Sequence, residues 1–266
     1  MRFLTLCLAT LAAPVAAHEF WIEPHAYLVD GETIIKGDLV NGEDFEGGKQ
    51  PYLPQRFVKF QTFAQGKFAD VPGRVGDNPG LRMDPIADGL HIFSYQSTPA
   101  TLDYESWEKF QRFVDHKKFG DIRPLHDARG LPESGFTEVY TRFSKTLVGV
   151  GNAQGSDGFT GLMTEIVALT NPYTDDLSDG MTFQLYANRA PRANAAFEVF
   201  EKAPDDTVTI TFYETDDQGQ VTVPVKAGHS YMADAVILRE PSADLARDTG
   251  AVWETLWANI TWGVPE

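Results

Sequence analysis

A histidine at position 18 lies where a signal peptide would end. Met1 and Arg2 give the chain a positive start, an apolar segment follows, and Val15 and Ala17 are the small residues expected before a cleavage site. Cleavage after Ala17 makes His18 the first residue of the mature chain. Its free α-amine, with an ordinary pKa of about 7.7–8.0, and its imidazole can then chelate one metal ion together.

A third nitrogen from another histidine would complete a T-shaped site, which suits Cu(II) or Ni(II). His229 is the first candidate, because it follows a glycine at the start of an expected strand, and His91 is the second. Glu19 and Glu23 offer carboxylate ligands, although acidic residues on such a strand are usually solvated. The other histidines are interpreted as surface or core residues: His25, His116 and His126.

The only cysteine, Cys7, lies in the segment that cleavage removes, so the mature chain has no thiolate site. The sequence contains no HExxH motif, EF-hand loop, GxSxG motif, P-loop or dinucleotide-binding fingerprint. We therefore assign no catalytic residue, expect a binding protein and not an enzyme, and consider a divalent transition metal (Ni, Co or Cu) as the cofactor.

The chain of 266 residues carries a formal charge of −16. Loss of residues 1–17, which contain one Arg and no acid, changes this charge to −17. Such a balance argues against nucleic acid and anionic membrane surfaces as partners. No later segment is long and apolar enough to span a bilayer, so the sequence predicts an exported, periplasmic protein with no direct membrane anchor.

The segment EVYTRFSK, residues 138–145, combines charged and aromatic residues. On a strand, Glu138, Tyr140 and Arg142 share one face. A buried Glu138–Arg142 pair that bridges two parts of the protein would explain these residue types. An anion-binding site is the alternative.

Hydrophobic alternation predicts strands at 19–29 (interrupted at Pro24), 33–40, 56–63 and 89–97. Helical spacing of Trp107, Phe110, Phe113 and Val114 predicts an amphipathic helix over 104–118. Seven further strands are expected, at 164–169, 181–186, 195–201, 208–214, 220–225, 230–238 and 252–262. Residues 137–150 fit both the helical period and the strand period.

These patterns predict a mainly β protein with two immunoglobulin-like or transthyretin-like β-sandwich parts and a short helical insertion in the first. The flexible sequence GNAQGSDG suggests the boundary between them. The expected organisation is a signal peptide (1–17), an N-terminal β-rich domain with the helical insertion (18–155) and a C-terminal immunoglobulin-like sandwich (156–266).

Five segments also resemble a family of exported bacterial proteins, catalogued as a domain of unknown function and often labelled a periplasmic component of nickel or cobalt uptake. They are HEFWIEP, EVYTRFSKTLVGVG, EIVALTNPY, GHSYMADAVIL and VWETLWANITW. The resemblance implies export, two sandwich-like parts and nickel or cobalt as the cargo. It transfers no catalytic set.

The sequence therefore predicts an exported protein that binds a divalent transition metal for uptake or buffering, through His18 with His229 or His91. A membrane transporter component is considered as a further partner. One alternative is a non-enzymatic module that binds a protein or glycan. The other is a copper oxidase of the N-terminal-histidine kind.

Overall fold

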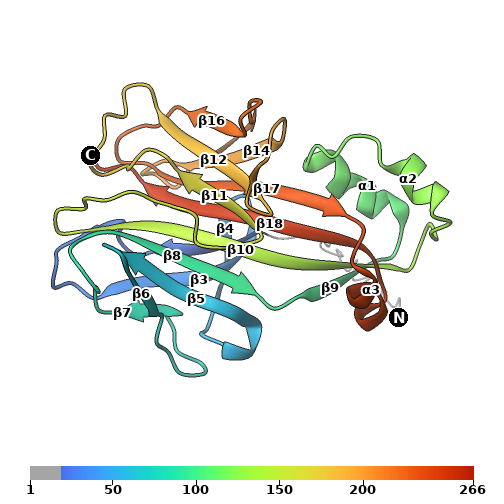
Figure 1. Cartoon of the computed structure of the whole chain (residues 1–266), viewed down its shortest axis with the longest axis horizontal. Helices are drawn as coiled ribbons and strands as arrows, with labels where there is room; N and C mark the ends of the chain where they lie inside the picture. Colours follow the sequence, from blue (N-terminus) through green and yellow to red (C-terminus); the bar gives the residue numbers. More distant parts are fainter. Residues whose placement is uncertain (1–18) are drawn as a thin grey trace, which may run out of the picture.

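The computed structural model describes residues 19–266, and three β-sheets dominate this range (Figure 1). The first sheet contains β1 (Glu19–Pro24), β3 (Ile35–Glu43), β4 (Glu46–Gln50) and β7 (Leu81–Met83). The third sheet contains β11 (Thr164–Ala168), β12 (Met181–Ala187), β13 (Ala190–Pro191) and β16 (Gln220–Val223).

The second sheet is the largest, with ten strands, and runs through the centre of the molecule (Figure 1). Its order is β15 (Val208–Glu214), β14 (Ala196–Lys202), β17 (Ser230–Arg239), β18 (Ala251–Gly263), β10 (Phe136–Val150), β8 (Gly89–Ser97), β5 (Phe57–Ala64) and β6 (Lys67–Asp70). Two short strands, β2 (Leu28–Val29) and β9 (Ala100–Tyr104), also pair with β10.

The two largest apolar cores lie between the sheets. One joins the third sheet to the second, with Phe183 of β12 packed against Trp262 of β18. The other joins the first sheet to the second, with Ile22 of β1 in the same cluster as Phe93 of β8. The expected mainly β fold with sandwich-like parts is thus confirmed, and the two sandwiches share the central sheet.

Strands β10 and β18 form the middle of that sheet and pair in parallel. Both strands are buried over almost their whole length, as expected for central strands covered on two faces. A strand buried on both faces lacks the alternation of apolar and polar residues that a strand buried on one face shows. The sequence of residues 137–150 therefore has no clear period.

The central sheet contains strands from both sides of the boundary expected after residue 155. The connection between β10 and β11 is anchored, because the side chain of Asp157 is only 1% exposed and binds the ammonium of Lys145 at 2.7 Å. The division into domains 18–155 and 156–266 stays a prediction.

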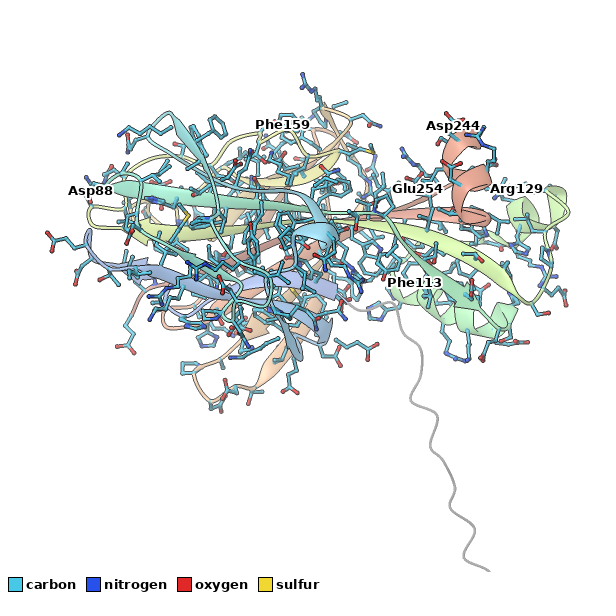
Figure 2. All side chains as sticks on the ribbon, turned by 90° about the horizontal axis from the view of Figure 1, so that it is seen from below. Asp88, Phe113, Arg129, Phe159, Asp244 and Glu254 are labelled. Carbon is cyan, nitrogen blue, oxygen red and sulfur yellow. The ribbon has the colours of Figure 1, made fainter. Side chains whose placement is uncertain are left out.

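The helices gather at the end of the molecule away from the C-terminus (Figure 1). They are α1 (Trp107–His116), α2 (Arg123–Ala128) and α3 (Ala243–Thr249); a single 3-10 turn, η1 (Pro54–Arg56), precedes β5. The expected amphipathic helix is confirmed as α1. Its buried residue Phe113 (Figure 2) packs against Trp257 of β18, and Phe110 packs against Trp253 of the same strand. No helix among residues 19–266 is long and apolar enough to cross a bilayer.

Candidate metal centre

The end of α1 carries a buried lysine that binds three carboxylates. The Nζ atom of Lys117 lies 2.8 Å from Glu19 Oε1, 2.7 Å from Glu198 Oε2 and 2.9 Å from Asp234 Oδ2. These acids come from β1, β14 and β17, so one ammonium ties the helix to two sheets. The same Nζ lies 4.8 Å from the ring centroid of Trp257.

The strand register explains why this cation is needed. Glu198 and Asp234 are direct partners on the antiparallel strands β14 and β17. Two like charges in this position repel each other, and both side chains are almost fully buried. Lys117 offsets that repulsion. Its own pKa would fall on burial, but the charges of Asp234, Glu19 and Glu198 raise it instead.

His116 stands beside this network at the protein surface. Its Nε2 atom lies 3.0 Å from Glu198 Oε1, and its side chain is 47% exposed. The interaction with Glu198 is the main cause that raises the pKa of His116. Burial opposes ionisation of Glu198, but His116 and Lys117 together lower the pKa of this carboxyl.

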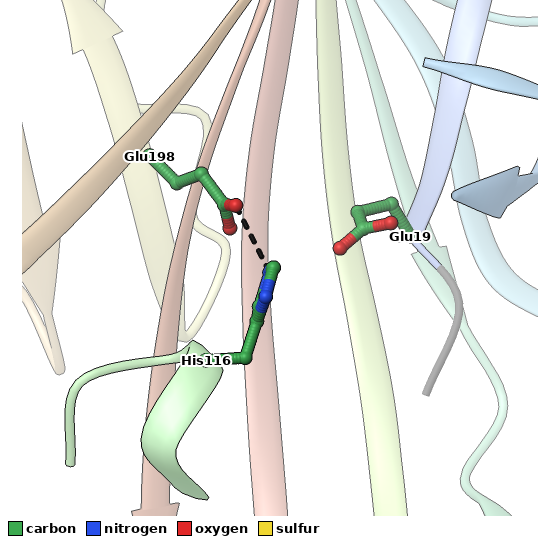
Figure 3. A group of neighbouring side chains, drawn as sticks. All are labelled: Glu19, His116 and Glu198. Carbon is green, nitrogen blue, oxygen red and sulfur yellow. Dashed lines mark ion pairs between the residues drawn. The ribbon is translucent and has the colours of Figure 1, made fainter. Parts of the chain in front are cut away.

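Three side chains converge closely enough to hold a metal ion. Ligand atoms of Glu19, His116 and Glu198 all lie within 4.8 Å of one another. In Figure 3 the imidazole of His116 stands between the two glutamates, which reach it from different sheets. A nitrogen and two carboxylate oxygens form a donor set that suits divalent transition metals.

The donor atoms in this group have unused capacity. Lys117 occupies Oε1 of Glu19 and Oε2 of Glu198, which leaves the other oxygen of each carboxylate. Oε1 of Glu198 is buried and faces Nε2 of His116 at 3.0 Å, so these two atoms could share one metal ion in place of the proton. Lys117 therefore orients the two carboxylates without filling their remaining coordination positions.

The net charge of the cluster also fits a divalent cation. Three carboxylates and one ammonium give −3 + 1 = −2 when His116 is neutral. Burial raises the pKa of Asp234 to about 6; the charge of Lys117 opposes this rise, and the charges of Glu19 and Glu198 add to it. A metal ion that replaces the proton on His116 would neutralise the remaining charge.

Of the histidines expected as ligands, His18 lies outside the described residues. His91 is fully buried, and both ring nitrogens are in hydrogen bonds, Nε2 with the N–H of Ile86 and Nδ1 with the carbonyl of Gly89. Burial lowers the pKa of His91, which favours the neutral imidazole. His229 Nδ1 lies 3.0 Å from Glu201 Oε1. Neither residue belongs to the group of Glu19, His116 and Glu198, the metal-competent group found among residues 19–266.

Sequence reasoning noted Glu19 as a candidate ligand but did not assign His116 or Glu198. One signal was present in α1. Lys117 follows Phe110 by seven residues and Phe113 by four, so it continues the apolar face of the helix. A charged residue at such a position indicates a buried partner, although it does not say which residue that partner is.

The expected Glu138–Arg142 pair is not formed by direct contact. Both side chains are buried, but the Glu138 carboxylate accepts hydrogen bonds from the hydroxyls of Tyr104 and Thr255. Burial raises the pKa of Glu138. The Arg142 guanidinium instead lies against aromatic rings.

The fold and the site define a β-sandwich protein with a buried acidic cluster that is closed by a lysine and bordered by an exposed histidine. The chain belongs to the family described as "Domain of unknown function (DUF4198)", whose model matches residues 15–239. This range includes the three carboxylates, the lysine and the histidine of the cluster. No curated protein sequence matches the chain.

Proposed function

We propose that this protein is exported to the periplasm and binds a divalent transition metal, nickel, cobalt or copper, for uptake or buffering. Glu19, His116 and Glu198 are the ligands, and the protein acts by capture and release without catalysis. The observation that carries the proposal is the convergence of their ligand atoms within 4.8 Å. The half-exposed His116 provides the entry side for the ion.

The proposal also includes His18. Consecutive Cα atoms lie about 3.8 Å apart, so cleavage after Ala17 would create a free amine one residue from Glu19. That amine and the His18 imidazole would add two nitrogens to the group. The set would then consist of nitrogen donors with one or two carboxylates, a composition that suits Ni(II) and Cu(II).

Proton competition gives the proposed site a way to release its ion. His116 must lose its proton to bind a metal, and the carboxylates must be ionised. Because Glu198 raises the pKa of His116, acidification returns the proton readily. Metal affinity should therefore fall as the pH is lowered through the range in which His116 titrates.

The chain offers a matched control histidine. His25 Nε2 lies 3.0 Å from the buried Asp38, and its side chain is 45% exposed. Asp38 is also bound by a lysine, Lys49, at 2.7 Å. His25 thus shares the exposure, the buried carboxylate and the lysine of the His116 site, but it is absent from the metal-competent group.

The test measures Ni²⁺, Co²⁺ and Cu²⁺ binding by calorimetry on untagged mature protein, with metal content checked by mass spectrometry. We expect His116→Ala and Glu198→Gln each to weaken binding at least about tenfold, which corresponds to about 1.4 kcal/mol. His25→Ala should bind as the wild type does. Equal affinity in His116→Ala and wild type, or an equal loss in His25→Ala, would overturn the assignment.

A further inference from the structure

A pocket lies between the first sheet and the central sheet, close to the acidic cluster. The charged residues in its lining are cationic. Its cavity has a volume of about 270 Å³. Residues from β1, β3, β4, β8, β9 and β10 contribute to its lining. The lining includes three aromatic and two cationic residues: Phe20, Tyr95, Tyr140, Arg56 and Arg142.

Arg142 is the unusual member of this lining. The residue is only 7% exposed, and its Nη1 atom is buried with no hydrogen-bond partner among the described residues. Within residues 19–266, no carboxylate lies at ion-pair distance from it. A buried guanidinium without an anion is costly, since its lost hydration is not replaced.

Aromatic rings hold this guanidinium in place. Its Cζ atom lies 4.7 Å from the ring centroid of Trp257 and 4.9 Å from that of Tyr140. The backbone N–H of Arg142 donates to the hydroxyl of Ser97 at 3.0 Å. The stacking fixes the planar group beside the cavity, and a guanidinium held in this way suits a carboxylate bound through two parallel hydrogen bonds.

The rest of the lining indicates an organic ligand. Phe20 and Tyr95 pack together with ring centroids 4.6 Å apart and present an aromatic wall. Arg56, an exposed residue, supplies a second positive charge. A lining that combines aromatic rings with guanidinium groups fits a small molecule with an apolar body and a carboxylate.

We propose that this pocket binds a small organic carboxylate, with Arg142 as its buried charge partner. The low exposure of Arg142 strengthens the ion pair, and the aromatic wall contacts the apolar body of the ligand. The exposed Arg56 adds attraction for the incoming anion. The pocket shares no ligand residue with the proposed metal centre, but the two are neighbours, since the charges of Glu19 and Asp234 act on Arg142. Arg142 and Lys117 also lie against the same ring, that of Trp257.

The experiment uses benzoate as the probe, with neutral benzamide and inorganic phosphate as comparators, and follows binding by calorimetry and ligand-observed NMR. We expect benzoate to bind, and to bind more tightly than benzamide or phosphate. Arg142→Met should weaken benzoate binding by roughly tenfold to a hundredfold, the loss expected for a charge-assisted bidentate contact. Arg142→Lys should recover only part of the affinity, because an ammonium lacks the planar fork.

A structural role for Arg142 would give a different result. Replacement of an unpaired buried charge by an apolar side chain is often neutral or stabilising, so Arg142→Met should not lower the thermal midpoint by more than a few degrees. Arg192→Met is the matched control. Its Nη1 is also buried without a partner, but its Nη2 donates to the Val236 carbonyl and it does not line the pocket.

Benzoate binding that is unchanged in Arg142→Met, or lost equally in Arg192→Met, would overturn the proposal. Binding of benzamide as tight as that of benzoate would show that the carboxylate does not contribute to binding, and would overturn the proposal. Binding of phosphate in preference to benzoate would show an inorganic oxyanion site and overturn the assignment of an organic ligand.

Discussion

Glu198 and Asp234 face each other on neighbouring antiparallel strands, and one oxygen of each binds the Nζ atom of Lys117. The side chains of these three residues are at most 4% exposed. Lys117 directly follows α1, and its ammonium offsets the repulsion between the two carboxylates. The repulsive cross-strand pair thereby attaches the helix to both strands. The same arrangement places His116, one residue earlier, over the remaining oxygen of Glu198.

Replacement of Lys117 by methionine should destabilise the protein strongly. The change leaves three carboxylates without their shared ammonium, and breaking a buried ion network in this way costs about 3–5 kcal/mol. Urea denaturation of the metal-free protein measures the loss. Lys49→Met serves as the control, since Lys49 also binds a buried carboxylate but is 61% exposed. Its loss should be much smaller, because water screens the exposed ammonium; similar losses would contradict the structural role of Lys117.

The stability of the metal-free protein should depend on pH through the titration of His116. Its pKa is raised in the folded state, mainly by Glu198, so this contact contributes stability below the unfolded pKa of about 6.5 and loses it as the pH rises through the folded value. The stability difference between wild type and His116→Asn should therefore be larger at about pH 5.5 than at about pH 8.5. Denaturant titrations at the two pH values measure it. A difference that does not change with pH would show that His116 is not held by Glu198.

The connection between the two sandwiches should depend on Asp157. Its carboxylate accepts from Lys145 and from the backbone N–H groups of Gly158 and Ala168. Asp157→Asn should cost about 1–3 kcal/mol, because the buried Lys145 loses one charge partner but keeps Glu165 at 3.1 Å. Exposed Asp217 provides the control, where the same change should have little effect. Hydrogen exchange over residues 151–163 should accelerate in Asp157→Asn alone; unchanged exchange would mean that other contacts hold the segment.

Processing of the N-terminus should control metal affinity. Mass spectrometry of protein secreted from a bacterial host should give a chain that begins at His18. A variant with one extra residue before His18 keeps the imidazole but moves the free amine, and we expect it to bind Ni²⁺ or Cu²⁺ more weakly. Equal affinity in the two forms would remove the amine from the site while leaving Glu19, His116 and Glu198 as ligands.

The sequence by itself determined the elements whose pattern is local. Alternating or apolar segments predicted β8 and β15 with the same bounds that the structure has, and helical spacing predicted α1. The structure also contains the exposed strand β4, which sequence reasoning did not predict. Its residues EGGKQ have no apolar alternation, so only pairing with β3 makes them a strand.

The tertiary structure alone decided the site. Lys117 meets Glu19, Glu198 and Asp234 across 98, 81 and 117 residues of sequence, and no local period reports such contacts. The sequence supplied a charged residue on an apolar helix face. Which carboxylates neutralise it depends on the strand register of β14 and β17 and on the place where β1 joins them, because buried charges must be paired in space and not along the chain.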